Sequence, residues 1–197
     1  VPEGVSGGRG VASSAEQLRD KEIFGPWPGF VQSFVVFANF LFRHNATIGI
    51  MTFRLGIAGG VPTILLLGYQ GVILGAFLAL HYNRGLLLDF IGWVTIHGVT
   101  EIGALILCGA GGLVIAEKVL FPGRYTRLDN LAREGKVAAG LAGGAVLMLF
   151  VAGLIEGGFR QLISDTPARL AFGAATGVLW VLYFLSNRSG KGDGAAT

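Results

Sequence analysis

Residues 94–112 have the sequence VTIHGVTEIGALILCGAGG. The segment is apolar and rich in glycine, yet it contains His97 and Glu101, which lie one turn apart if the segment is helical. Ionisable side chains in an apolar segment are costly at membrane depth, so they usually face the interior of a protein. We therefore predict a membrane-embedded helix whose polar side turns towards other helices.

The composition of the whole chain also indicates a membrane protein. Of its 197 residues, 52% are hydrophobic and only 14% are charged, whereas a soluble domain has about 25% charged residues. Crossing a bilayer as a helix takes roughly 20 apolar residues. Long runs without Asp, Glu, Lys or Arg cover 55–80, 102–116, 137–155 and 170–187. The predicted fold class is all-α, a polytopic bundle of transmembrane helices.

The spacing of the polar residues predicts about four full spans. The apolar pieces 72–80 and 86–96 are each too short to cross, so we expect a re-entrant hairpin or a pair of short helices there. Segment 30–42 is expected to form an N-terminal helix that lies along the interface or enters the membrane. The full spans are expected at about 46–67, 97–120, 137–157 and 167–187.

A single membrane-embedded helical domain is expected over residues 28–187. Residues 1–27 are polar and are expected to form a tail or linker, and residues 188–197 a disordered cytoplasmic tail. The loop 121–136 is rich in Lys and Arg, so the positive-inside rule places it in the cytoplasm. With four spans, both termini are then cytoplasmic, and we expect a multi-pass protein of the inner cell membrane.

Glycine is unusually frequent: 33 of the 197 residues are glycine, whereas glycine makes up roughly 7% of an average protein. Pairs four residues apart give a helix a flat groove in which a second backbone can approach closely. We expect helix packing within the chain at such pairs, with contact to a second copy as the alternative. The pairs are Gly56 and Gly60, Gly71 and Gly75, Gly140 and Gly144, Gly153 and Gly157, and Gly173 and Gly177.

Four ionisable residues interrupt or border the apolar runs: His97, Glu101, Arg54 and Glu156. The least costly arrangement pairs Arg54 with Glu101 or Glu156 while His97 hydrogen-bonds a neighbour. A structural polar cluster is the preferred interpretation. A relay for protons or ions, and a metal or hydrolase site, are the alternatives.

Several kinds of chemistry find no support in the sequence. It contains neither HExxH nor GxSxG, and the single Cys108 excludes an intrachain disulfide. The HxxxE spacing supplies two ligands from one helix, whereas tight zinc binding needs three or four. We therefore expect no enzymatic activity, no metal and no cofactor. Basic and aromatic residues do not alternate as in nucleic-acid-binding proteins, so no nucleic-acid partner is expected.

The block HGVTEIGALILCGAGGLVIAEKVLFPGR, residues 97–124, resembles the stage II sporulation protein M family of bacterial membrane proteins. The family pattern is roughly HGxxELxAIxxAGxxGLxLGxxLLxPGR. Upstream, LGIAGGVPT and QGVILGAF follow the order of the family's motifs, and IEGGF at 155–159 matches its IEGF element. The resemblance covers about residues 40–160. It departs at Gln70, where the family has Asn, and at Glu117, where it has a small residue.

In sporulating bacteria the family member belongs to a membrane complex that remodels peptidoglycan during engulfment, and its partners do the hydrolysis. The resemblance thus implies a non-enzymatic scaffold or accessory subunit of a larger membrane protein complex. The expected partners are membrane lipid, other integral membrane proteins and a second copy in a homo-oligomer. The alternative is a small ion- or proton-coupled transporter or channel that uses His97, Glu101, Arg54 and Glu156.

Overall fold

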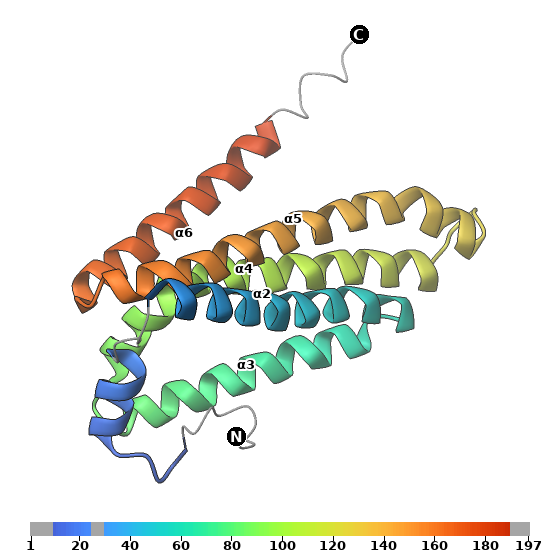
Figure 1. Ribbon diagram of the computed structural model, residues 1–197. Coiled ribbons are helices and arrows are strands. Elements are labelled where there is room, and N and C mark those ends of the chain that lie inside the picture. The colour runs from blue at the N-terminus through green and yellow to red at the C-terminus, as the bar shows by residue number, and fades with distance from the viewer. Residues whose placement is uncertain (1–9, 25–29, 190–197) are drawn as a thin grey trace.

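The computed structural model describes residues 10–24 and 30–189 (Figure 1). The described residues form helices and connecting turns, without strands. The long helices are α2 (Phe30–Arg54), α3 (Val61–Tyr82), α4 (Leu87–Leu120), α5 (Arg127–Leu162) and α6 (Thr166–Ser189). A short π-helix, η1 (Gln17–Ile23), precedes them, and a 3-10 turn, η2 (Leu55–Ala58), joins α2 to α3. All five long helices are long and apolar enough to cross a membrane, which confirms the all-α polytopic bundle.

Helix α4 is the centre of the bundle and contacts each of the other four long helices. The core beside it contains small residues, Ala104 and Cys108 of α4 and Ala145 of α5, together with Leu149 and Met148. Small side chains let helix backbones approach, which is how helices gain van der Waals contact where lipid removes the hydrophobic driving force. Helix α6 packs on α4 and diverges from α5 towards its C-terminus (Figure 1).

The first helix boundary differs from the prediction. Residues 43–45 do not end a helix, because α2 runs through them to Arg54. The break falls at Gly59 and Gly60, whose φ angles are 86° and 81°. Glycine adopts such left-handed conformations without steric cost, and Pro62 then opens the first turn of α3. The break therefore comes from backbone geometry and not from the polar residues.

The predicted re-entrant hairpin is wrong. Residues 72–80 form the second half of α3, and residues 86–96 form the start of α4, each within a continuous helix. Likewise, 30–42 is the first half of α2 and not a separate interfacial helix. The start of α2 and the end of α6 lie at opposite ends of the bundle (Figure 1).

The described part of the polar N-terminal segment, residues 10–24, packs against the bundle instead of forming a free tail. The side chains of Leu18 and Ile23 are buried. The guanidinium of Arg84 donates hydrogen bonds to backbone carbonyls of this segment. The buried guanidinium of Arg169, at the start of α6, donates to the carbonyl of Ile23. Of the predicted C-terminal tail, residues 188–189 belong to the end of α6, and residues 190–197 lie outside the described residues.

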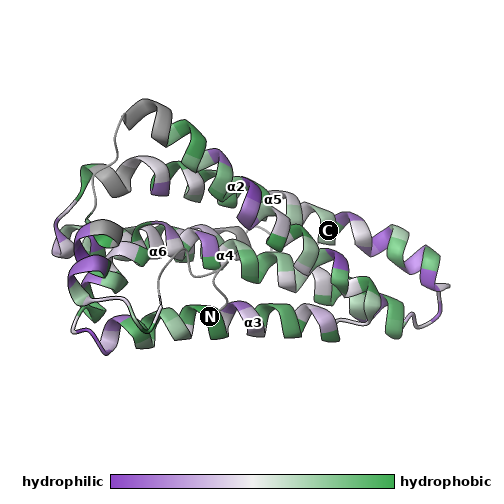
Figure 2. Cartoon of the chain, turned by 60° about the horizontal axis from the view of Figure 1, so that its bottom comes forward, coloured by the Kyte–Doolittle hydropathy of each residue, from purple (hydrophilic) through white to green (hydrophobic). Residues whose placement is uncertain are grey.

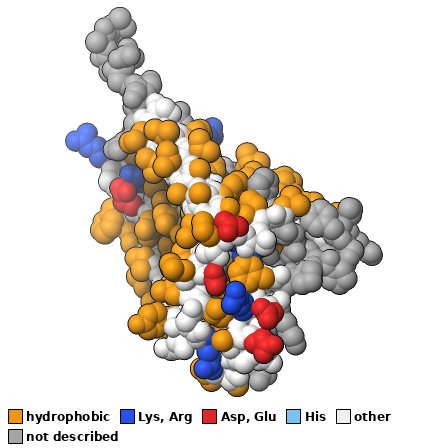
Figure 3. Space-filling view, turned by 90° about the vertical axis from the view of Figure 1, so that its left-hand side faces the viewer, with side chains coloured by type: hydrophobic (Ala, Val, Ile, Leu, Met, Phe, Trp, Pro, Cys, Tyr) orange, Lys and Arg blue, Asp and Glu red, His pale blue; other side chains and the backbone are white. Residues whose placement is uncertain are grey.

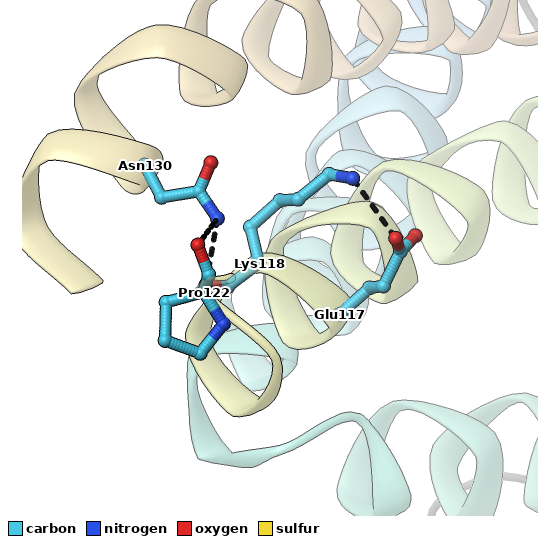
Figure 4. A network of polar contacts seen from close by, with 4 residues as sticks. All are labelled: Glu117, Lys118, Pro122 and Asn130. Carbon is cyan, nitrogen blue, oxygen red and sulfur yellow. Dashed lines mark hydrogen bonds and ion pairs between the residues drawn. The ribbon is translucent and has the colours of Figure 1, made fainter. Parts of the chain in front are cut away.

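Polar contacts fix the turn from α4 to α5 (Figure 4). The side-chain amide of Asn130 donates to the backbone carbonyls of Lys118 and Pro122. The last carbonyls of a helix have no partner within it, so these bonds satisfy the exposed end of α4. Glu117 is exposed and accepts a hydrogen bond of 2.9 Å from Nζ of Lys118. This departure from the family pattern is therefore accommodated at the helix surface.

Two of the predicted glycine pairs lie at close contacts with α4. A Cβ atom at Gly56 would overlap the backbone of Gly112 on α4, and one at Gly60 would lie 3.0 Å from Ala116. At Gly173 of α6 it would lie 2.7 Å from the Cβ of Thr95 on α4. At Gly177 the nearest atom would be at 3.6 Å, an ordinary van der Waals distance.

The packing role predicted for Gly140 and Gly144 is corrected by the structure. No described neighbouring atom lies within 4 Å of a Cβ built at either position. Both line a groove of about 650 Å³ between α5 and α6, which also includes Trp180. The groove exists because α6 diverges from α5 here, so no other helix among the described residues packs closely on these glycines.

We predict opposite effects of alanine at two glycines. Gly56→Ala should lower the free energy of unfolding by about 1–3 kcal/mol, because its methyl group overlaps a backbone that cannot rotate away. Gly140→Ala should leave stability unchanged or raise it by up to about 1 kcal/mol through higher helix propensity. Unfolding in detergent micelles, followed by circular dichroism, measures both, and equal effects would contradict the packing described here.

Candidate functional site

Three of the four predicted ionisable residues meet between α4 and α5. His97 and Glu101 lie on α4, and Glu156 lies on α5. Nε2 of His97 is 3.5 Å from Oε2 of Glu156. One ligand atom from each of the three residues lies within 4.8 Å of the others. His97 and Glu156 are buried and Glu101 is half-buried, so we call these three residues the polar cluster.

Small residues next to Glu156 let α2 cover the polar cluster. A Cβ at Gly157 would lie 3.0 Å from the ring of Phe34 and 3.1 Å from Cβ of Ala38, both on α2. A Cβ at Gly153, one turn earlier, would lie 3.3 Å from the carbonyl oxygen of Ala38. The glycines therefore hold α2 close to α5 and keep this side of the cluster away from lipid.

An aromatic column leads from the end of α3 to the polar cluster. The rings of His81 and Phe90 stack with centroids 3.9 Å apart, and Trp93 follows at 5.7 Å from Phe90. The ring of Trp93 then meets that of His97 edge-on, with centroids 5.8 Å apart. Such aromatic packing restricts the orientation of the His97 imidazole and directs its Nε2 towards α5.

A cavity of about 340 Å³ borders the polar cluster on the α3 side. His97 and Glu101 line it from α4, and Gln70 lines it from α3. Built Cβ atoms at Gly71 and Gly75 of α3 have no neighbour within 4 Å among the described atoms. Helix α3 therefore stands off from α4 at this level, and the cluster is accessible from between the two helices.

The family model for stage II sporulation protein M matches residues 11–159. The chain belongs to this family. The match includes α2 to α4 and most of α5 and so contains all three residues of the polar cluster, whereas α6 lies outside it. No curated protein and no solved structure matches the chain.

The fourth predicted residue, Arg54, is not part of the polar cluster in this family member. It is exposed at the end of α2. Gly56, two residues further along, contacts Gly112 of α4, which lies roughly 16 Å along that helix from Glu101. Arg54 therefore lies near the end of the bundle, away from Glu101 and Glu156, and the predicted pairing with a glutamate is corrected.

Sequence reasoning missed two polar residues next to the cluster. Nε1 of Trp180 on α6 donates a hydrogen bond of 3.0 Å to Oγ1 of Thr100, which is buried on α4. This bond holds α6 against α4 one turn from His97. The sequence indicates that Thr100 lies near His97, because it follows His97 by three residues and shares its helix face. The sequence does not indicate its partner, Trp180, which lies eighty positions away in the chain.

We predict that His97 and Glu156 are energetically coupled. His97→Gln and Glu156→Gln should each lower the free energy of unfolding by about 3 kcal/mol, because each leaves a buried polar group with a lost partner. The double variant should lose less than the sum, with a coupling of about 0.5–3 kcal/mol. Chemical unfolding in micelles measures all four states. Glu117→Gln, exposed on the same helix, is the control, and additive losses would contradict the pair.

Proposed function

We propose that this chain is a non-catalytic subunit of a larger membrane protein assembly and that a partner helix binds along α2. The observation that carries the proposal is a row of exposed polar side chains in the middle of α2. Figure 2 shows hydrophilic residues interrupting this helix. The row consists of Asn39, Arg43, His44 and Thr47, which share one helix face and are all exposed. We call it the α2 polar stripe.

The α2 polar stripe lies level with an apolar part of the neighbouring helix α5. A Cβ at Gly49 of α2 would lie 3.2 Å from Leu149 of α5, and one at Gly153 of α5 would lie 3.3 Å from Ala38 of α2. Arg43 lies between these contacts, level with the uncharged run 137–155 of α5. An arginine at the centre of a membrane helix costs roughly 2.5–3.5 kcal/mol or more, which favours a bound partner.

The contacts within the chain satisfy the stripe only in part. Oγ1 of Thr47 donates a hydrogen bond of 2.7 Å to the carbonyl of Arg43, and the ring of His44 stacks on that of Phe40 with centroids 6.0 Å apart. In the described part of the chain, no carboxylate lies within ion-pair distance of the Arg43 guanidinium. A membrane-embedded cation of this kind calls for a carboxylate from outside the chain.

The charge of the stripe argues for a different protein and against a second copy. A two-fold dimer through α2 places each stripe against its own equivalent. Two Arg43 side chains then meet at membrane depth, and like charges repel strongly there. A transmembrane helix with an Asp or Glu near its centre is complementary to Arg43. We therefore assign this type of partner to the α2 polar stripe.

Site-specific crosslinking tests the proposal in native membranes. A photo-reactive amino acid at position 47 should give one discrete adduct with another membrane protein, whereas the same residue at position 64, exposed on α3, should not. Arg43→Glu should abolish the adduct and Arg43→Lys should retain most of it. Arg54→Glu, exposed at the end of the same helix, is the matched control and should have no effect.

The crosslinked partner decides between the outcomes. The proposal requires a spanning segment with an acidic residue, and exchanging that residue for Lys should restore the adduct with Arg43→Glu. A crosslinked dimer of this chain would instead show a homo-oligomer. Absence of any adduct, or an adduct insensitive to Arg43→Glu, would refute a partner bound through the stripe.

We further propose that the α4–α5 turn faces the cytoplasm of a bacterial cell and that η1 lies on the outer side of the inner membrane. The turn and its flanks contain Lys118, Arg124, Arg127, Arg133 and Lys136. At the opposite end of the bundle, acidic and basic side chains are mixed (Figure 3). The positive-inside rule favours the more basic end as cytoplasmic.

Thiol labelling of intact cells tests this orientation. Cysteines at the exposed positions Val11 and Leu128, introduced singly after Cys108→Ala, should differ in their reaction with a membrane-impermeant maleimide. The reagent should label position 11 in intact cells, and it should label position 128 only after the cells are lysed. The reverse pattern would invert the orientation.

A further inference from the structure

We propose that the polar cluster is a binding site for one divalent transition-metal ion, held by His97, Glu101 and Glu156. The HxxxE spacing of α4 offers only two ligands, and the fold adds the third from α5. An imidazole with two carboxylates suits borderline divalent ions of the Mn²⁺ to Zn²⁺ class. Helical bundles commonly build such sites from inward-facing side chains of facing helices. This proposal does not depend on the partner proposed for α2.

The distances within the cluster match those around a single ion. Ligand atoms about 2.1 Å from a tetrahedral ion lie roughly 3.4 Å apart. The 3.5 Å between Nε2 of His97 and Oε2 of Glu156 is already close to this separation. The three ligand atoms all lie within 4.8 Å of one another. A small rotation of the Glu101 side chain, which is half-buried beside a cavity, would bring its carboxylate into range.

The charges in the cluster favour a cation between the carboxylates. Ligand atoms of Glu101 and Glu156 lie within 4.8 Å of each other and of the His97 imidazole. Two carboxylates held this close repel each other unless a proton or a metal ion lies between them. A divalent ion bound to both carboxylates and to a neutral imidazole neutralises the site without leaving a net charge at membrane depth. A shared proton is the competing arrangement, and the experiment below separates the two.

The surroundings of the cluster meet the other requirements of a metal site. The cavity between α3 and α4 gives an entry path, and its Gln70 side provides room for a water ligand. The aromatic contact with Trp93 restricts the imidazole ring, as supporting groups do in metal sites. Because the ligands come from two helices, a bound ion would crosslink α4 to α5 at the centre of the bundle.

Metal titration of the full chain tests the proposal. Tag-free protein purified in detergent is stripped with a chelator and titrated separately with Zn²⁺ and Mn²⁺. Elemental analysis should find one ion of at least one of these metals per chain, and the ion should raise the thermal unfolding midpoint by several degrees. His97→Gln and Glu156→Gln should each weaken binding by about a hundredfold or more, since even loss of supporting groups costs 10–100-fold.

Glu117→Gln, on the exposed surface of α4, should bind like the unmodified chain. If the cluster variants fail to fold, Co²⁺ bound to the unmodified chain still reports the site, because its visible absorption spectrum reflects nitrogen and oxygen coordination. No stoichiometric metal in the unmodified chain would overturn the proposal and leave a shared proton. Binding of equal strength in folded His97→Gln and Glu156→Gln proteins would overturn it as well.

Discussion

A bilayer cannot solvate ionised side chains, and this constraint determines where α4 and α5 meet. His97, Glu101 and Glu156 would each be costly if they faced lipid. Between two helices they lie close together, with Nε2 of His97 3.5 Å from the carboxylate of Glu156. This pair and the apolar contacts of Ala104 and Cys108 with Ala145 and Leu149 lie on the same α4–α5 interface.

Small residues around the cluster allow the helices to pack closely enough to keep it away from lipid. Gly157 and Gly153 of α5 let α2 approach within van der Waals distance, and the Gly56–Gly112 contact does the same near the other end of α2. Larger residues at these positions would push the helices apart and open the cluster to lipid. Close packing and polar pairing are thus two parts of one arrangement around α4.

The cost of burying charge in a membrane leads to different interpretations of the polar cluster and of the α2 polar stripe. The cluster lies between α4 and α5, is covered by α2 and opens to the cavity beside α3, so groups of the chain together with a bound ion can neutralise its charges. The α2 polar stripe is exposed on the outside of the bundle, and for this reason we propose that another protein supplies the carboxylate for Arg43. Membership of the stage II sporulation protein M family agrees with a membrane protein, and the stripe is the feature through which we propose that the chain joins an assembly.

The sequence by itself determined the all-α membrane fold, because the lack of charge over long runs leaves no soluble alternative. It also singled out His97, Glu101 and Glu156, since an ionisable residue in an apolar run is visible without a structure. It misplaced the helix boundaries between residues 30 and 96, because polar residues at 43–45 and 81–89 resemble loop ends in a hydropathy pattern, whereas helices continue through most of them.

Only the tertiary structure decided which charges meet and which do not. Arg54 and Arg43 are both arginines of α2, yet one reaches the end of the bundle and the other stays exposed at its middle. The rotation and register of α2 against α5 cause this difference, and they arise from contacts between residues more than a hundred positions apart, such as Ala38 with Gly153. A local pattern contains no information about such contacts, because helix periodicity fixes a face but not its neighbour.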